Sequence, residues 1–163
     1  SRIPLLTKGL AEAGMNPEDS VAMFNYDSSE ESIVLGYAVV EGKGQPIVKT
    51  SECSVEELQQ EYSDSKCVGI IVPDEESLKE MMKETKDFDG LESACGWDPR
   101  SPVGPRFAVF LKSDKSSQQL QDDLGLGGRV TDEETGLSFQ VGVPVNCFTF
   151  DQLLEAGKKQ QSA

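Results

Sequence analysis

Apolar residues recur at helical spacing near the start of the chain. Leu5, Leu6, Leu10 and Ala13 share one face if residues 3–13 form a helix, and the glycine that follows is typical of a helix end. The pattern predicts an amphipathic helix that turns this face towards a core.

Further helices are predicted where a polar residue precedes a helical pattern. A Ser, Thr or Asp side chain accepts a hydrogen bond from an otherwise unpaired amide in the first turn of a helix. Glu or Gln three positions later strengthens the pattern, as it does after Ser54, Ser116 and Thr149. These positions and Asp74 predict four helix starts. Gly125, in the glycine-rich run 125–128, is predicted to end the helix that follows Ser116.

Two segments, 67–72 and 107–112, are rich in apolar residues with little alternation. A continuous apolar strand is covered on both faces, so both segments are predicted to be central strands of a sheet.

Shorter or alternating apolar runs predict further strands. Segments 20–27 and 32–42 are interpreted as strands joined at an acidic hairpin tip, residues 27–32, and 46–50 as a short third strand. Residues 128–148 are interpreted as a hairpin region with a polar tip.

The order of these elements predicts an α/β fold, with α+β as the alternative. We expect a single globular domain over residues 1–163, built on a mixed β-sheet of about five to seven strands with helices on both faces. A proline-rich connector at 95–106 interrupts the pattern.

The charge balance narrows the classes of partner. The chain has 29 acidic and 15 basic residues and a net charge of −14, so nucleic acid and anionic membrane surfaces are disfavoured. No apolar run is long enough to predict membrane insertion. We expect an intracellular soluble protein, in the cytoplasm or, because the sequence begins with Ser1, in an organelle after removal of a leader.

The chain contains no histidine, which removes the commonest general base and the commonest transition-metal ligand. The four cysteines are widely spaced, and Cys67 and Cys147 lie in apolar runs that predict buried, reduced thiols. No metal or cofactor is therefore predicted. The sequence favours a protein that is not an enzyme, although carboxylate, lysine or cysteine chemistry stays open.

The connector contains the only tryptophan of the chain and three of its eight prolines. Prolines stiffen a segment, and Trp and Arg are common at binding hot spots. The candidate binding residues are therefore Trp97, Asp98, Arg100 and Arg106. In the alternative interpretation, Trp97 folds back over the sheet as an anchor of its own loop.

Together these features predict a non-enzymatic, acidic protein–protein interaction or assembly subunit. Its partner would be a protein, and a basic one would suit the charge. A small enzyme domain that uses carboxylate or cysteine chemistry is an alternative.

A second alternative comes from a family resemblance. The succession "DSVAMFNYD", "SIVLGYAVVEG", "SVEELQQEYSDSKCVGIIV" and "FAVFLKSDKSSQQLQDDL", followed by a last helix, resembles the order of elements in actin-depolymerising-factor homology domains. The resemblance implies an actin-binding module. It rests on element order over most of the chain and carries no residue roles over.

Overall fold

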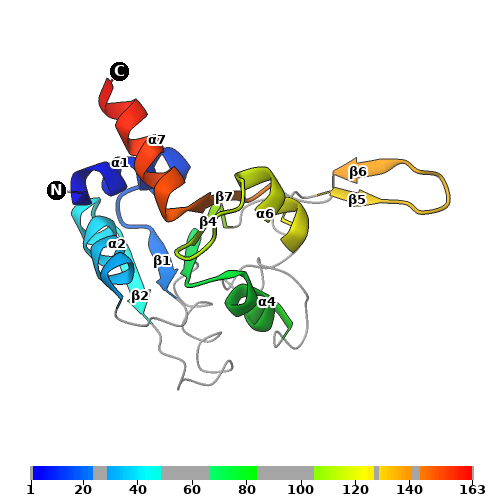
Figure 1. Cartoon of the computed structure of the whole chain (residues 1–163), viewed down its shortest axis with the longest axis horizontal. Coiled ribbons are helices and arrows are strands. Elements are labelled where there is room, and N and C mark those ends of the chain that lie inside the picture. Colours follow the sequence, from blue (N-terminus) through cyan, green and yellow to red (C-terminus); the bar gives the residue numbers. More distant parts are fainter. Residues whose placement is uncertain are drawn as a thin grey trace.

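A five-stranded parallel sheet forms the centre of the molecule (Figure 1). The structure is a computed structural model that describes residues 2–23, 29–48, 67–83, 105–126, 129–140 and 144–162. Across the sheet the strands lie in the order β2 (Gln45–Val48), β1 (Ser20–Met23), β3 (Gly69–Val72), β4 (Phe107–Phe110) and β7 (Asn146–Thr149). Every neighbouring pair in this sheet is parallel.

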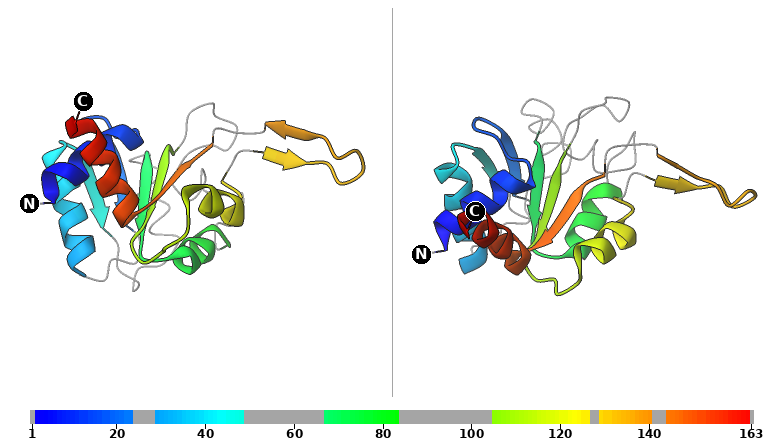
Figure 2. Two further views of the ribbon diagram at one scale, coloured as in Figure 1. Left: turned by 45° about the horizontal axis from the view of Figure 1, so that its top comes forward. Right: turned by 90° about the horizontal axis from the view of Figure 1, so that it is seen from above.

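Helices cover both faces of the sheet (Figure 2). One face carries α1 (Ile3–Ala13), α2 (Glu30–Glu41) and α7 (Phe150–Ser162). The other carries α4 (Glu75–Lys83) and α6 (Ser117–Leu124). The predicted α/β class, the helices on both faces and a sheet within the expected range of strands are confirmed.

The two predicted central strands are confirmed. All residues of β3 and β4 are buried. On β4, Ala108 and Phe110 point to the α4–α6 side, whereas Phe107 and Val109 point to the α1–α2–α7 side. Because successive strand residues face opposite sides, a fully apolar strand supplies both cores at once.

The helix starts predicted from capping residues within the described ranges are also confirmed. Ser116 Oγ accepts from the amide of Gln119 (3.1 Å), and Asp74 Oδ1 accepts from the amide of Ser77 (2.9 Å). Gly125 ends α6 with a φ of 67°, a left-handed conformation that glycine adopts readily. The helix predicted after Ser54 lies outside the described residues.

The strand predicted at residues 32–42 is wrong, because this segment belongs to helix α2. Ser29 caps the helix by accepting from the amide of Ser32 (3.3 Å), so this part of the predicted hairpin tip is a helix start. Two acidic residues in the first turn, Glu30 and Glu31, favour the start further through the helix dipole.

A second, two-stranded sheet extends away from the main body (Figures 1 and 2). Strands β5 (Arg129–Thr131) and β6 (Ser138–Gln140) pair in antiparallel fashion, which confirms the hairpin predicted in this region. The main sheet is therefore entirely parallel rather than mixed as predicted, since β7 also joins it parallel to β4, and the antiparallel pairing among the described residues lies in this separate hairpin.

Candidate functional site

The carboxyl ends of the parallel strands meet at one edge of the main sheet. Counted along the chain within this sheet alone, β7 is the fifth strand, and the order across the sheet is 2-1-3-4-5. This is a doubly wound arrangement, in which ligands bind outside the carboxyl edge. Residues 73–75 follow β3 at this edge, and residues 111–116 follow β4. Both segments carry charged side chains, so this edge is the candidate site.

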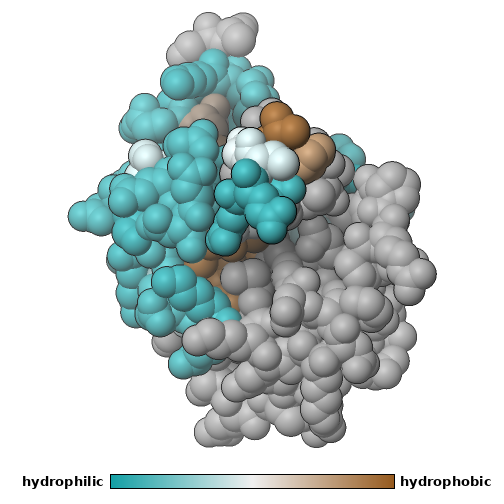
Figure 3. Space-filling view, turned by 90° about the vertical axis from the view of Figure 1, so that its right-hand side faces the viewer, coloured by the Kyte–Doolittle hydropathy of each residue, from teal (hydrophilic) through white to brown (hydrophobic). Residues whose placement is uncertain are grey.

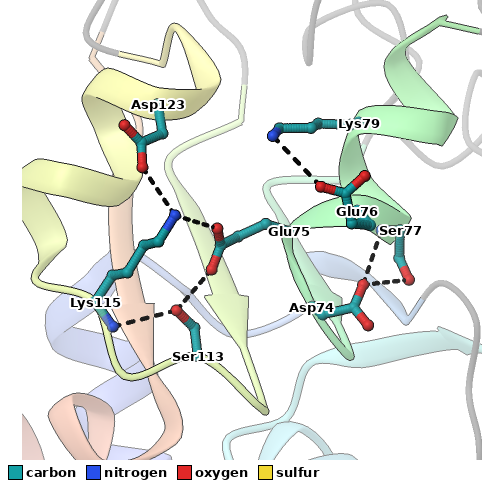
Figure 4. Close-up of polar contacts among 8 residues, drawn as sticks. All are labelled: Asp74, Glu75, Glu76, Ser77, Lys79, Ser113, Lys115 and Asp123. Carbon is teal, nitrogen blue, oxygen red and sulfur yellow. Dashed lines mark hydrogen bonds and ion pairs between the residues drawn. The ribbon is translucent and has the colours of Figure 1, made fainter.

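Four side chains form a connected polar group there, which we call the carboxyl-edge cluster: Glu75, Ser113, Lys115 and Asp123 (Figure 4). Lys115 Nζ donates to Glu75 Oε2 (2.8 Å) and to Asp123 Oδ2 (2.9 Å). Ser113 Oγ donates to Glu75 Oε1 (2.8 Å). Lys115 therefore lies between the start of α4 and the last turns of α6, and holds both with one ammonium group.

The contacts fix the protonation states of this cluster. The hydrogen bond to Glu75, followed by the one to Asp123, raises the pKa of Lys115 above its ordinary value. The same bond from Lys115 is the largest cause of a lowered pKa at Glu75, and burial opposes it only in part. A protonated amine has no free electron pair, so Lys115 is suited to electrostatic positioning rather than to nucleophilic or base catalysis.

The start of α7 is tied to the same edge through Gln152. Its Nε2 donates to the carbonyl of Lys115 (3.2 Å), and its Oε1 accepts from the amide of Thr149 (2.9 Å). In return, Thr149 Oγ1 accepts from the amide of Gln152 (3.2 Å), which confirms the predicted cap. The turn after β4 is thus held by α4, α6 and α7 together.

Sequence reasoning did not single out the carboxyl-edge cluster. The available signal was that Glu75 and Lys115 each follow a buried strand, because polar residues at those positions meet at one edge of a parallel sheet. Among the described residues, no group of three or more acidic or cysteine side chains is arranged to hold a metal ion.

Arg106, the one described member of the predicted binding set, is partly exposed and is bound to groups of its own chain. Its Nη1 donates to the carbonyl of Gly14 (2.9 Å) and to Asp19 Oδ2 (3.1 Å), at the opposite edge of the sheet from the cluster. This arginine therefore binds a carboxylate of its own chain. Trp97, Asp98 and Arg100 lie outside the described residues, so their binding role stays a prediction.

Cys67 and Cys147 are buried thiols, as the sequence predicts for these two cysteines. Burial raises the pKa of the Cys147 thiol to about 12, so it carries almost no thiolate near neutral pH. Cys147 is therefore a packing residue rather than a nucleophile. Cys53 and Cys95 lie outside the described residues.

Comparison with solved structures finds the same fold in adenylating enzymes. The chain aligns with the A domain of a carboxylic acid reductase from Segniliparus rugosus, solved with AMP and a co-purified carboxylic acid, at a TM-score of 0.64, 12% identity and 96% coverage of this chain. The adenylation domain of the Mycobacterium chelonae carboxylate reductase gives a TM-score of 0.64 at 10% identity, with 97% of this chain covered. Coronafacic acid ligase from Pectobacterium brasiliense gives 0.55 at 13% identity, with 94% covered.

The likeness covers only part of each solved structure. The chain spans 22% of the Segniliparus domain, 21% of the Mycobacterium domain and 23% of the Pectobacterium ligase. No protein-family model and no curated protein matches the sequence. No helix among the described residues is long and apolar enough to cross a membrane.

These findings correct the main functional prediction, a non-enzymatic acidic interaction or assembly subunit. The solved structures that share the fold belong to enzymes and not to interaction or assembly subunits. The order of elements that resembled actin-depolymerising-factor homology domains is altered too, since α2 replaces the strand expected at 32–42.

Proposed function

We propose that this chain is part of an adenylating enzyme that activates a carboxylic acid. The observation that carries the proposal is the shared fold along almost the whole chain with two carboxylate reductase adenylation domains and an acid ligase. One of those domains was solved with AMP and a carboxylic acid, which suggests the same classes of ligand for this protein.

Adenylation of an acid joins its carboxylate to AMP. A carboxylate oxygen attacks the α-phosphorus of ATP, the bond to the bridging oxygen breaks, and pyrophosphate leaves with the electron pair. The developing negative charge needs positively charged or hydrogen-bonding groups nearby. Since the chain covers about a fifth of the solved domains, the remaining part of a longer enzyme would supply most of them.

In this proposal the described residues act as a scaffold at the carboxyl edge. The carboxyl-edge cluster joins the start of α4, the segment after β4 and the end of α6. Lys115 keeps its positive charge there at neutral pH. Lys115 is a positioning residue, because both of its side-chain partners belong to the protein itself.

The test is carboxylate-dependent exchange of pyrophosphate into ATP. Antibodies raised against this chain would capture the native polypeptide from its source, and exchange would be measured with aliphatic and aromatic acids in turn. We expect a polypeptide several times longer than 163 residues, with exchange that depends on at least one acid. A captured polypeptide with no exchange for any acid would refute the proposal.

Two variants of the same polypeptide test the scaffold role. Lys115→Met should lower the exchange rate several-fold, because it frees the turns around the carboxyl edge. Lys159→Met removes an exposed positive charge near the end of α7 and should leave the rate unchanged. Equal effects of both substitutions would mean that the cluster has no special part in the activity.

A further inference from the structure

Gln152, the third residue of α7, binds three separate segments through one side chain. Its Nε2 donates to the carbonyl of Lys115 (3.2 Å) in the segment after β4. Its Oε1 accepts both from the amide of Thr149 (2.9 Å), which precedes α7, and from the hydroxyl of Ser117 (3.1 Å), which begins α6. α7 and α6 cover opposite faces of the sheet, so this side chain connects the two helical layers.

The two ends of the Gln152 amide have different tasks. The oxygen completes the cap of α7, in which Thr149 Oγ1 accepts in return from the amide of Gln152. A cap of this kind needs only an acceptor at position 152, and glutamate supplies one as well as glutamine does. The donor to the carbonyl of Lys115 is the contact that glutamine alone can make.

The peptide groups on both sides of Lys115 are held in place. Its amide donates to Ser113 Oγ (3.3 Å; Figure 4), and its carbonyl accepts from Gln152. Ser113 Oγ in turn donates to Glu75 Oε1 (2.8 Å) at the start of α4. The backbone from which the Lys115 side chain extends is therefore fixed relative to both α4 and α7.

The ion pairs of Lys115 are too exposed to fix its side chain by themselves. The side chain of Lys115 is 34% exposed and that of Asp123 is 38% exposed. The described surface at the end of the molecule near α6 and the hairpin is mostly hydrophilic (Figure 3), and water screens charges in such a place. Ordering a lysine side chain also costs rotamer entropy, and a fixed backbone leaves fewer torsions to order.

We propose that Gln152 is the positioning residue that keeps Lys115 between Glu75 and Asp123. It acts through the carbonyl of Lys115, and this role is separate from the capping of α7. The inference deepens the scaffold role of the carboxyl-edge cluster, and it rests on the proposed function only for its effect on activity. Through Gln152, the first turn of α7 sets where the positive charge lies at the carboxyl edge.

The test is acetylation of the 163-residue chain by an activated ester near pH 8, with the rate at each lysine followed by peptide mass analysis. Only a neutral amine reacts, and the hydrogen bonds to Glu75 and Asp123 raise the pKa of Lys115, so Lys115 should react slowly in the unchanged chain. Gln152→Glu keeps the acceptor for the cap and loses the donor to Lys115. We expect Lys115 to react about tenfold faster in this variant, because a fall of about one unit in its pKa gives ten times more neutral amine.

Two matched controls separate positioning from stability and from charge. Thr149→Ala weakens the same cap but leaves the contact between Gln152 and the carbonyl of Lys115, so it should lower the melting temperature without changing the rate at Lys115. Gln160→Glu makes the same change of charge near the end of α7, where Gln160 Nε2 donates to Glu12 Oε2 (2.6 Å). It should also leave the rate at Lys115 unchanged.

Gln152→Met repeats the test without an added carboxylate that could itself bind Lys115. Faster labelling of Lys115 in either Gln152 variant, with Thr149→Ala unchanged, supports the proposal. Equal rates in the unchanged chain and in both Gln152 variants would overturn it, as would an equal rise in Thr149→Ala. A parallel rise at Lys8, an exposed lysine of α1, would show general opening of the fold and would also contradict a specific role.

The labelling test needs neither ATP nor an acid, so its result is independent of the proposed adenylating activity. In the longer polypeptide, Gln152→Glu should lower the carboxylate-dependent exchange of pyrophosphate by about as much as Lys115→Met. The double variant should be no slower than the slower single variant, because both changes disturb one contact. Losses that multiply would show that Gln152 acts independently of Lys115. Absence of exchange in the unchanged polypeptide would refute the proposed function and leave the labelling result standing.

Discussion

Lys115 and Glu75 stabilise each other through one hydrogen bond between two charged groups. The bond raises the pKa of Lys115 and lowers that of Glu75, so the stability from this pair is present above the ordinary pKa of a free glutamate. It is lost as the pH falls through the lowered pKa of Glu75. On the alkaline side it is lost only as the pH rises through the raised pKa of Lys115.

We therefore expect Lys115→Met to lower the melting temperature at neutral pH, with a smaller difference from the unchanged chain below about pH 4.5, the ordinary glutamate value. Both side chains of the pair are partly exposed, so solvent screens the effect. Thermal unfolding followed by circular dichroism from pH 3 upward checks this. A difference that stays constant into acid would show that the contact with Glu75 carries no stability.

The thiol of Cys147 should react only when the protein opens. Its pKa of about 12 leaves roughly one thiolate in ten thousand thiols at pH 8, and the residue is 2% exposed. Iodoacetamide labelling followed by peptide mass analysis should find Cys147 unmodified in the native protein and modified in urea. Fast native labelling at this position would contradict its role as a packing residue.

At the residue scale, the sequence predicts local contacts well and distant ones poorly. The caps at Asp74, Ser116 and Thr149 follow from neighbours three positions away. The contact between Lys115 and Glu75 spans 40 positions and exists only because two parallel strands end at the same edge. A local sequence pattern therefore does not predict a contact between residues that lie so far apart in the chain.

Helices α1 and α7 pack closely because each has a glycine at the contact. A methyl group added at Gly157 would strike the backbone carbonyl of Leu5, and one added at Gly9 would strike that of Leu153. Backbone atoms cannot move aside as flexible side-chain ends do. The two glycines therefore set the distance between the helices.

Gly157→Ala should lower stability by about 1–3 kcal/mol, because α1 and α7 must separate. Gly36→Ala is the matched control within α2, where the added methyl group would lie 3.9 Å from Met23 Sδ, an ordinary contact. It should raise stability by about 0.5–1 kcal/mol, since alanine favours a helix interior. Urea unfolding of both variants gives the two signs, and equal signs would contradict this account of the contact.

At the element scale, α2 shows why one helix was mistaken for a strand. Its residues Ile33, Val34, Val39 and Val40 are β-branched, and apolar positions lie on both sides of the helix. A helix apolar on both sides loses the 3.6-residue period on which the prediction depends. The cap at Ser29 and the acidic first turn were the better signal.

At the scale of the whole molecule, the sequence predicted the class of fold, whereas the non-enzymatic function that it favoured is contradicted by the comparisons. The fold class follows from buried strands between capped helices, and this pattern survives at 10–13% identity to the solved domains. The lack of histidine and the acidic charge were taken as evidence against an enzyme. Neither bears on the scaffold role that we propose, because a scaffold needs a buried sheet and fixed turns rather than a general base.

The arrangement of the two sheets predicts a gradient of stability across the molecule. β3 and β4 are buried and each has a strand on both sides, so their amides should exchange only through global unfolding. The β5–β6 hairpin has two strands, extends from the body and exposes Phe139, and an isolated pair of strands is marginally stable. Hydrogen exchange followed by mass spectrometry should therefore find that amides of the hairpin exchange at least about a hundredfold faster than those of β3 and β4, equivalent to about 3 kcal/mol of local stability.

Equal protection in both sheets would mean that the hairpin has a covering partner in solution. Repeating the measurement on Leu137→Glu then shows whether its exposed side chains hold that partner, because loss of the partner would restore fast exchange in the hairpin alone.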